Sequence, residues 1–220
     1  MAQPKLNSLP FDRRPLIVLV CLITALTGVS GLLLLLEPTP LAPIGGPILT
    51  VLDSTPRGFD ELLANQRDLD EQRWQAIIIH HSGTSAGSAS ALGSTHQSLG
   101  HGGLLYHFVV GNGNGADDGQ VQIGYRWNRQ AGGPHVPDGP NAAWLNQHAI
   151  AICLVGDGDL RSPTARQMDQ LVGLVTSLQK RLAIPADRVL LHANVAATTS
   201  PGLLFPTSAF RQQLLEVETR

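Results

Sequence analysis

Two short apolar runs, each ending in a histidine, place the strongest limit on how this chain can fold. Residues 77–79 are three isoleucines followed by His80 and His81, and the apolar residues 189–191 are followed by His192. Runs of this length and composition predict buried β-strands that stop at an imidazole. If both strands belong to one sheet, their ends can bring His80 and His192 together as part of a zinc site. The alternative is that each is a buried core histidine. Strand alternation turns His81 to the opposite face, where a supporting or packing role is expected.

The other periodic segments complete a single α/β domain. The predicted strands span residues 75–80, 104–110, 120–125, 149–155 and 188–192. A helix over 164–182 carries a broad apolar face, and a second amphipathic helix fits 208–218. We therefore expect residues 74–220 to form a central mixed β-sheet flanked by helices.

The N-terminal part has a different composition. Residues 1–15 carry Lys5, Arg13 and Arg14 against the single acid Asp12, and residues 16–36 contain no charged side chain. This pattern predicts one transmembrane helix with a cytoplasmic N-terminus. A cleaved signal peptide is the competing interpretation. Residues 37–73 follow as a proline-rich tether with a short helix near 58–73, because proline at this density disfavours both helix and central strand.

Charge and cysteine content exclude some classes of function. A net charge of -2 and a pI near 6.4 give no reason to expect nucleic acid as a partner. Two cysteines, Cys21 and Cys153, do not form a disulfide framework, since one lies in the first apolar run and the other in a distant strand. Both are interpreted as small apolar fillers.

Four segments occur in an order that resembles a known family. They are residues 77–82, 105–110, 150–157, and 191–195 continued to Ser200-Pro201-Gly202. Their order and spacing resemble the zinc-dependent N-acetylmuramoyl-L-alanine amidases, a family that includes phage amidases and animal peptidoglycan recognition proteins. The resemblance covers roughly residues 74–210. It implies a Zn²⁺ cofactor, a peptidoglycan or muropeptide partner, and hydrolysis of the amide between N-acetylmuramic acid and L-alanine.

The resemblance also implies roles for single residues. His80 and His192 match the two histidine zinc ligands, and Tyr106 matches the tyrosine that assists the attacking water. Residues His96, His135, Asn146 and Thr198 fall at positions expected to contact substrate. The alternative for His96, His135 and Asn146 is that they are ordinary surface polar residues.

Ser200 is the departure from the family pattern. Active relatives carry cysteine or aspartate at this third ligand position, and both are anionic on Zn²⁺, whereas a serine hydroxyl is neutral and is not a usual zinc ligand. Relatives with serine here resemble recognition proteins that bind peptidoglycan fragments without cutting them.

Three functions are therefore compared. The first is an amidase, favoured by His80, His192 and Tyr106; the second is a membrane-tethered peptidoglycan-binding module without turnover, favoured by Ser200 and Thr198. A serine hydrolase is the third, but no Gly-x-Ser-x-Gly pattern surrounds Ser82 or Ser200. Both leading hypotheses predict a bacterial inner-membrane protein with its domain on the periplasmic or outer side, or a secreted one if the N-terminal segment is cleaved.

Overall fold

The computed structural model describes residues 22–24, 27, 49–50, 56–64 and 69–218. The chain divides into two units, residues 1–42 and 43–220, and the second contains the sheet. The predicted membrane segment 16–36 lies mostly outside the described residues; its described positions 22–24 and 27 are helical. Within the described part of the chain, no helix combines the length and apolar character needed to cross a bilayer.

A six-stranded mixed sheet forms the centre of the second unit. Its strands are β1 (Leu49–Thr50), β2 (Ala76–His81), β3 (Phe108–Val110), β4 (Val121–Ile123), β5 (Ala149–Leu154) and β6 (Val189–Leu191). They lie in the order β1-β4-β3-β5-β2-β6. β2 pairs in parallel with both β5 and β6, β3 pairs in parallel with β5, and β4 is antiparallel to β3 and β1. The predicted mixed α/β fold is confirmed, with β3, β4 and β6 shorter than the apolar patterns suggested.

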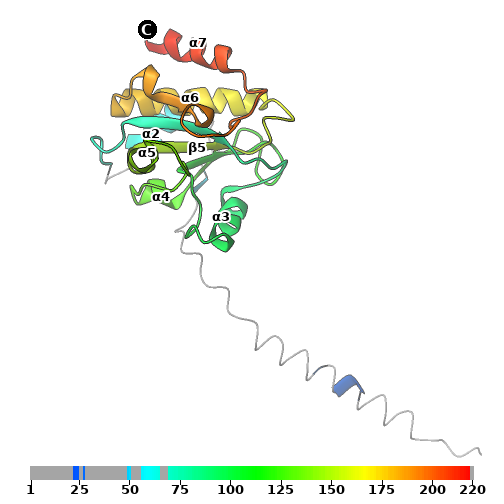
Figure 1. Ribbon diagram of the computed structural model, residues 1–220. Coiled ribbons are helices and arrows are strands. Elements are labelled where there is room, and N and C mark those ends of the chain that lie inside the picture. The colour runs from blue at the N-terminus through cyan, green and yellow to red at the C-terminus, as the bar shows by residue number, and fades with distance from the viewer. Residues whose placement is uncertain (1–21, 25–26, 28–48, 51–55, 65–68, 219–220) are drawn as a thin grey trace, which may run out of the picture. The chain divides into compact units, whose positions relative to one another are not determined.

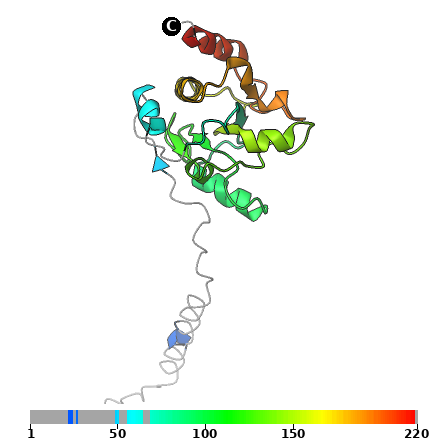
Figure 2. The same cartoon turned by 90° about the vertical axis from the view of Figure 1, so that its left-hand side faces the viewer.

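One face of the sheet is covered by three helices. They are α2 (Pro56–Ala64), α6 (Ala165–Leu182) and α7 (Thr207–Glu218), and Figure 2 shows α6 end-on beneath α7. α6 begins at a capping box between Thr164 and Gln167, and it ends at Ala183, whose φ of 52° is left-handed. Its apolar residues pack with alternate side chains of β2, such as Ile77 and Ile79, in the main core.

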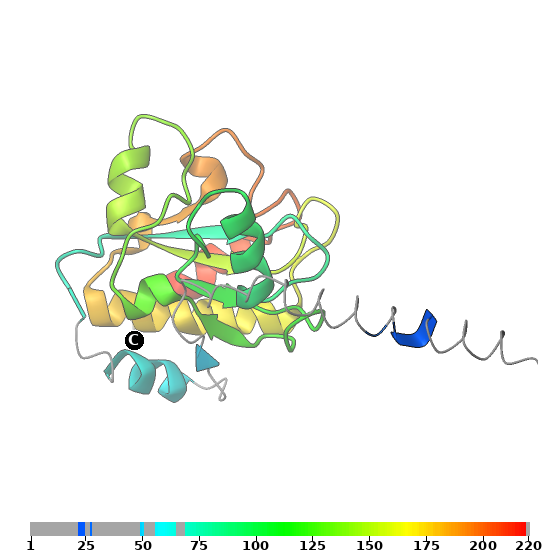
Figure 3. The same ribbon diagram turned by 90° about the horizontal axis from the view of Figure 1, so that it is seen from below.

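The packed unit begins before Trp74, where the sequence suggested that the folded domain starts. Phe59 and Leu63 of α2 are fully buried in the same core as α6, and Figure 3 shows α2 (cyan) beside α6. β1 pairs with β4. The segment expected to be a tether with a short helix therefore contributes a helix, α2, and an edge strand, β1, to the domain.

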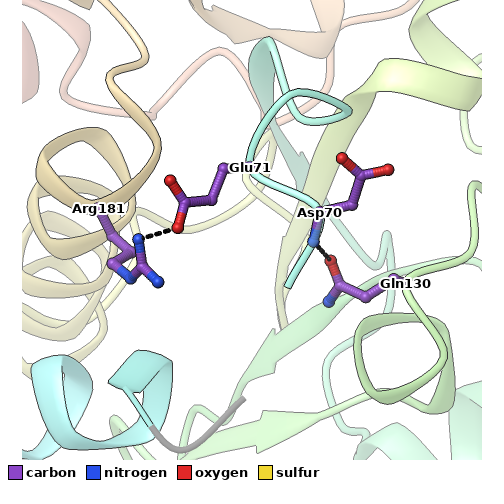
Figure 4. A network of polar contacts seen from close by, with 4 residues as sticks. All are labelled: Asp70, Glu71, Gln130 and Arg181. Atoms are coloured by element: carbon purple, nitrogen blue, oxygen red, sulfur yellow. Dashed lines mark hydrogen bonds and ion pairs between the residues drawn. The ribbon is translucent and has the colours of Figure 1, made fainter. Parts of the chain in front are cut away.

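The residues just before β2 are also fixed to the domain. Arg181 of α6 forms an ion pair with Glu71, and the Asp70 backbone N–H donates to Gln130 Oε1 at 3.4 Å (Figure 4). Trp74 Nε1 donates to the same Gln130 oxygen at 2.6 Å. These contacts fix where β2 begins, and the strand carries His80 at its other end.

The opposite face of the sheet carries the short helices α3 (Ala89–Ser98), α4 (Tyr125–Asn128) and α5 (Ala142–His148). Figure 1 shows α3 and α4 on the side away from α6 and α7. Ile78 on this face packs with Val136 and Leu145. His80 follows Ile78 by two residues, so strand alternation places its side chain on this same face.

Candidate functional site

The ends of β2 and β6 bring the two predicted ligand histidines together. These strands pair in parallel, with Ile79 opposite Leu191, so His80 and His192 follow at the same edge. Their ring centroids lie 4.3 Å apart. The Nε2 atoms of both rings are buried and have no hydrogen-bond partner. The predicted convergence of these two residues is therefore present in the structure, and two ring nitrogens there are available for a ligand.

Ser200 lies beside this pair, but its hydroxyl oxygen already serves the backbone. The oxygen accepts a hydrogen bond from the His81 backbone N–H at 3.1 Å, and Ser200 itself is 4% exposed. The Ser200 backbone N–H donates to Thr198 Oγ1 at 3.1 Å. The first contact holds the 198–202 turn against the end of β2, and the second lies within the turn.

A tight approach between two loops fixes the same turn. Gly202 has a φ of 113°, and a β-carbon on it would lie 2.1 Å from the Gly158 carbonyl carbon. The Gly158 backbone N–H also donates to His81 Nδ1 at 2.9 Å. His81 therefore holds this loop through one ring nitrogen, in agreement with the supporting role expected from strand alternation.

Tyr106 lies next to His80 in the residues leading into β3. Their ring centroids are 5.2 Å apart. Burial raises the pKa of the Tyr106 phenol well above its ordinary value, and the neighbouring Cys153 acts in the same direction. The phenol is therefore protonated at neutral pH and can donate a hydrogen bond.

A third imidazole, His135, packs against His80 from the loop before α5. Their ring centroids lie 5.3 Å apart with the ring planes at 86°. His135 is 4% exposed, and both of its ring nitrogens are buried without a hydrogen-bond partner. The next residue, Val136, is held by Asn146, whose amide donates to the Val136 carbonyl and accepts from its N–H, each at 2.8 Å.

The remaining predicted substrate contacts lie around this core of the site. His96, on α3, has its ring centroid 5.5 Å from that of Tyr106, and its Nδ1 accepts from the Leu105 backbone N–H at 3.2 Å. Thr198 is half-buried in the Ser200 turn. Their contact with substrate stays a prediction, as does that of Asn146 and His135.

Comparison with known proteins agrees with this geometry. The family model for N-acetylmuramoyl-L-alanine amidase matches residues 70–203. The chain belongs to this family. The endolysin amidase LysCS from Clostridium intestinale is 25% identical, with a TM-score of 0.56, over 65% of this chain and 84% of that one. The bumblebee peptidoglycan recognition protein PGRP-SA shares the fold at 22% identity and a TM-score of 0.50, over 66% of this chain and 89% of its own. A search of curated proteins finds no match.

The electrostatics of the site suit metal binding of the kind known in amidases. Burial lowers the pKa of His80 well below its ordinary value, and the neighbouring His135 and His192 lower it further. Burial also lowers the pKa of His192, and that of His135 to about 3. The Ala149 backbone opposes the shift at His135, although no hydrogen bond of normal geometry joins the two. All three imidazoles are therefore neutral at neutral pH, which is the form that binds a metal ion.

The donor set fits Zn²⁺ in part. The unpartnered, buried Nε2 atoms of His80 and His192 are two imidazole ligands of the type that zinc prefers. Among the described residues, however, no group of three histidine, cysteine, aspartate or glutamate side chains is arranged as a complete metal site. The third ligand is therefore not in place in the conformation observed.

Two supporting residues were missed in the sequence. Arg126 donates to the Leu104 carbonyl through Nε at 2.7 Å and to the Gly132 carbonyl at 2.6 Å, which connects the loops that carry Tyr106 and His135. Asp159 accepts from Thr199 Oγ1 at 2.6 Å and from the Leu203 N–H at 2.8 Å. No local pattern identifies either residue, because each partner lies on another loop of the fold.

Proposed function

We propose that the protein hydrolyses the amide bond between N-acetylmuramic acid and L-alanine in peptidoglycan. The observation that carries this proposal is the paired His80 and His192 with free, buried Nε2 atoms and with Tyr106 beside them. Family membership supports the substrate class, because the matched family acts on this bond.

The residues divide the chemistry between them. His80 and His192 would hold Zn²⁺ through Nε2. When bound, this ion would lower the pKa of a coordinated water molecule and polarise the carbonyl of the amide bond. The protonated Tyr106 phenol donates a hydrogen bond to the carbonyl oxygen as negative charge develops there.

The proposed reaction is the hydrolysis of one amide bond by one water molecule. Water oxygen forms a bond to the lactyl carbonyl carbon, and the bond from that carbon to the alanine nitrogen breaks. One proton from water goes to the departing nitrogen, so that the products are a carboxylic acid and the amine of the stem peptide. We propose that His96, whose ring packs against that of Tyr106, contacts the sugar or the peptide around this bond.

Incubation of the purified chain with a muramyl dipeptide tests the proposal. We expect a new peptide amine, detected by mass spectrometry, that depends on added Zn²⁺ and disappears in His80→Ala. Absence of product at every zinc concentration would refute hydrolysis.

A second function is favoured by Ser200, the neutral residue at the third ligand position. In this alternative the same site binds muropeptides without cutting them. Calorimetric binding of an intact muropeptide, together with no product after long incubation, would support this function over hydrolysis.

We further propose that residues 16–36 anchor the protein in a bacterial inner membrane, with the domain on the periplasmic or outer side. The uncharged segment and its basic flank support this location. Protease digestion of intact spheroplasts should remove the domain, and recovery of the whole protein in the soluble extracellular fraction would contradict the anchor.

A further inference from the structure

We propose that Arg126 is a positioning residue that sets where the Tyr106 phenol lies relative to His80. Arg126 touches neither of these rings and acts through the backbone of the loop that leads to Tyr106. The position of the phenol can be measured without turnover, so the assignment rests on the proposed function only where turnover is the readout.

The guanidinium of Arg126 bridges the two loops that lead to Tyr106 and His135. Its Nε donates to the Leu104 carbonyl at 2.7 Å, and Nη1 donates to the Gly132 carbonyl at 2.6 Å. Leu104 lies two residues before Tyr106 in the sequence. Gly132 lies three residues before His135. One planar cation therefore fixes the distance between the backbones that carry these two side chains.

Packing around the guanidinium leaves no space for it to shift without moving the loops. A β-carbon on Gly133 would lie 2.6 Å from the Leu105 carbonyl oxygen and 2.9 Å from Arg126 Cδ. The Gly133 backbone is therefore in direct contact with both neighbours. Since Leu105 immediately precedes Tyr106, a displacement at Arg126 or Gly133 passes directly to the backbone of Tyr106.

The charge of Arg126 is directed at backbone carbonyls. In the part of the chain that the structure describes, no carboxylate forms an ion pair with it. Its Nη2 reaches the His101 carbonyl at 3.5 Å, and its Cζ lies 5.0 Å from the Tyr125 ring, whose hydroxyl donates to the Gly102 carbonyl at 3.2 Å. Hydrogen bonds from a cation are stronger than neutral ones, and a planar fork of donors is specific to arginine. Lysine at this position would keep the charge and lose the bridge.

The position of Tyr106 depends on this bridge because its other loop contact is weaker. The ring centroid of Tyr106 lies 5.2 Å from that of His80 and 5.5 Å from that of His96. His96 holds the loop through one neutral hydrogen bond, from the Leu105 N–H to its Nδ1 at 3.2 Å. Without Arg126 the loop is free to shift, and the phenol leaves its place beside His80. A misplacement of about 1 Å at a reacting group can lower the rate about 100-fold.

Fluorine NMR of the full chain reports the position of Tyr106 directly. The chain has two tyrosines, so incorporation of fluorotyrosine gives two resonances, which Tyr106→Phe assigns. We expect the Tyr106 resonance to shift in Arg126→Lys. Arg129→Gln is the matched control, because this exposed arginine lies over the same Tyr125 ring at 5.5 Å, and it should shift the Tyr125 resonance alone. An unmoved Tyr106 resonance in Arg126→Lys, or an equal shift in Arg129→Gln, would overturn the assignment.

Gly133→Ala disturbs the same bridge without changing any charge. The added methyl group presses on the Leu105 carbonyl and on Arg126, so we expect the Tyr106 resonance to shift here as well. This variant decides the question if Arg126→Lys does not fold. A Tyr106 resonance that stays in place in Gly133→Ala would show that the bridge does not set the position of the phenol.

Turnover of muramyl dipeptide separates the assignment from the proposed function. In Arg126→Lys we expect kcat to fall about 100-fold with little change in KM. Phe59→Ala, which loosens the core on the other face of the sheet, should keep kcat, and an equal loss there would overturn a positioning role. No product from the unaltered chain, with the Tyr106 resonance shifted in Arg126→Lys, would refute hydrolysis and leave the assignment standing. Equal kcat in Arg126→Lys and the unaltered chain would refute the assignment and leave hydrolysis standing.

Discussion

Replacing Phe59 by alanine tests whether helix α2 is part of the folded domain. Phe59 is 1% exposed and lies so close to α6 that a β-carbon on Gly173 would be 3.2 Å from its ring. Truncation of a buried phenylalanine costs about 3–5 kcal/mol. We expect the lower end, about 3 kcal/mol, because a short helix can move away instead of leaving a rigid cavity.

Urea unfolding followed by tryptophan fluorescence measures this loss. Trp74 and Trp127 are both 1% exposed, so their emission reports on the core directly. Leu160→Ala is the matched control, because Leu160 is 75% exposed and its truncation should change the free energy of unfolding by less than about 0.5 kcal/mol. If Phe59→Ala behaves like this control, α2 does not stabilise the domain and the packing argument fails.

Three further outcomes are expected at the site. Folding lowers the pKa of His135 from 6.5 to about 3, so the unfolded state binds more protons than the folded state once the pH drops below 6.5. Lowering the pH from 7.5 to 5 in the presence of a chelator should therefore reduce the free energy of unfolding by about 2 kcal/mol through His135. Urea titration at each pH measures this loss. A profile that is identical in His135→Leu would contradict this. Tyr106→Phe should reduce muropeptide turnover at least ~100-fold while binding changes little, since the phenol acts on charge that develops in the transition state; equal turnover would remove Tyr106 from the mechanism. Asn146→Ala should cost about 1–3 kcal/mol of unfolding free energy, because both Val136 backbone contacts are lost. Asn141→Ala, at a helix start where the side chain makes no capping hydrogen bond, is the calorimetric control.

The parts of the fold that the sequence predicted are those with long or strongly apolar patterns. β2, β5 and α6 were placed within one residue of their observed ends, because each is a long apolar or periodic run bounded by clear stop signals. The approach of His80 to His192 followed from the same signal, since both residues end strands that pair in parallel.

Other parts had no local signal strong enough to predict them. α4 has four residues and β1 has two, too few for a hydrophobic period to appear. The proline-rich composition of residues 37–73 indicated a tether, and it concealed the burial of Phe59 and Leu63 against α6. That burial depends on tertiary contact across more than a hundred residues of sequence, which composition does not encode.

Ser200 shows most clearly how sequence and structure contribute to the site. The residue type alone identified the weak third ligand, because a neutral hydroxyl replaces an anionic group. The structure adds that this hydroxyl oxygen accepts a backbone hydrogen bond from the end of β2, which gives the serine a structural role that does not depend on metal. It also places His135, which the family pattern assigned to substrate, 5.3 Å from His80 with two unpaired nitrogens. A metal ion held by neutral ligands alone keeps its full charge, whereas a thiolate or carboxylate would neutralise part of it. Such an ion would polarise a carbonyl more strongly, so the loss of the anionic ligand weakens metal binding without by itself excluding catalysis.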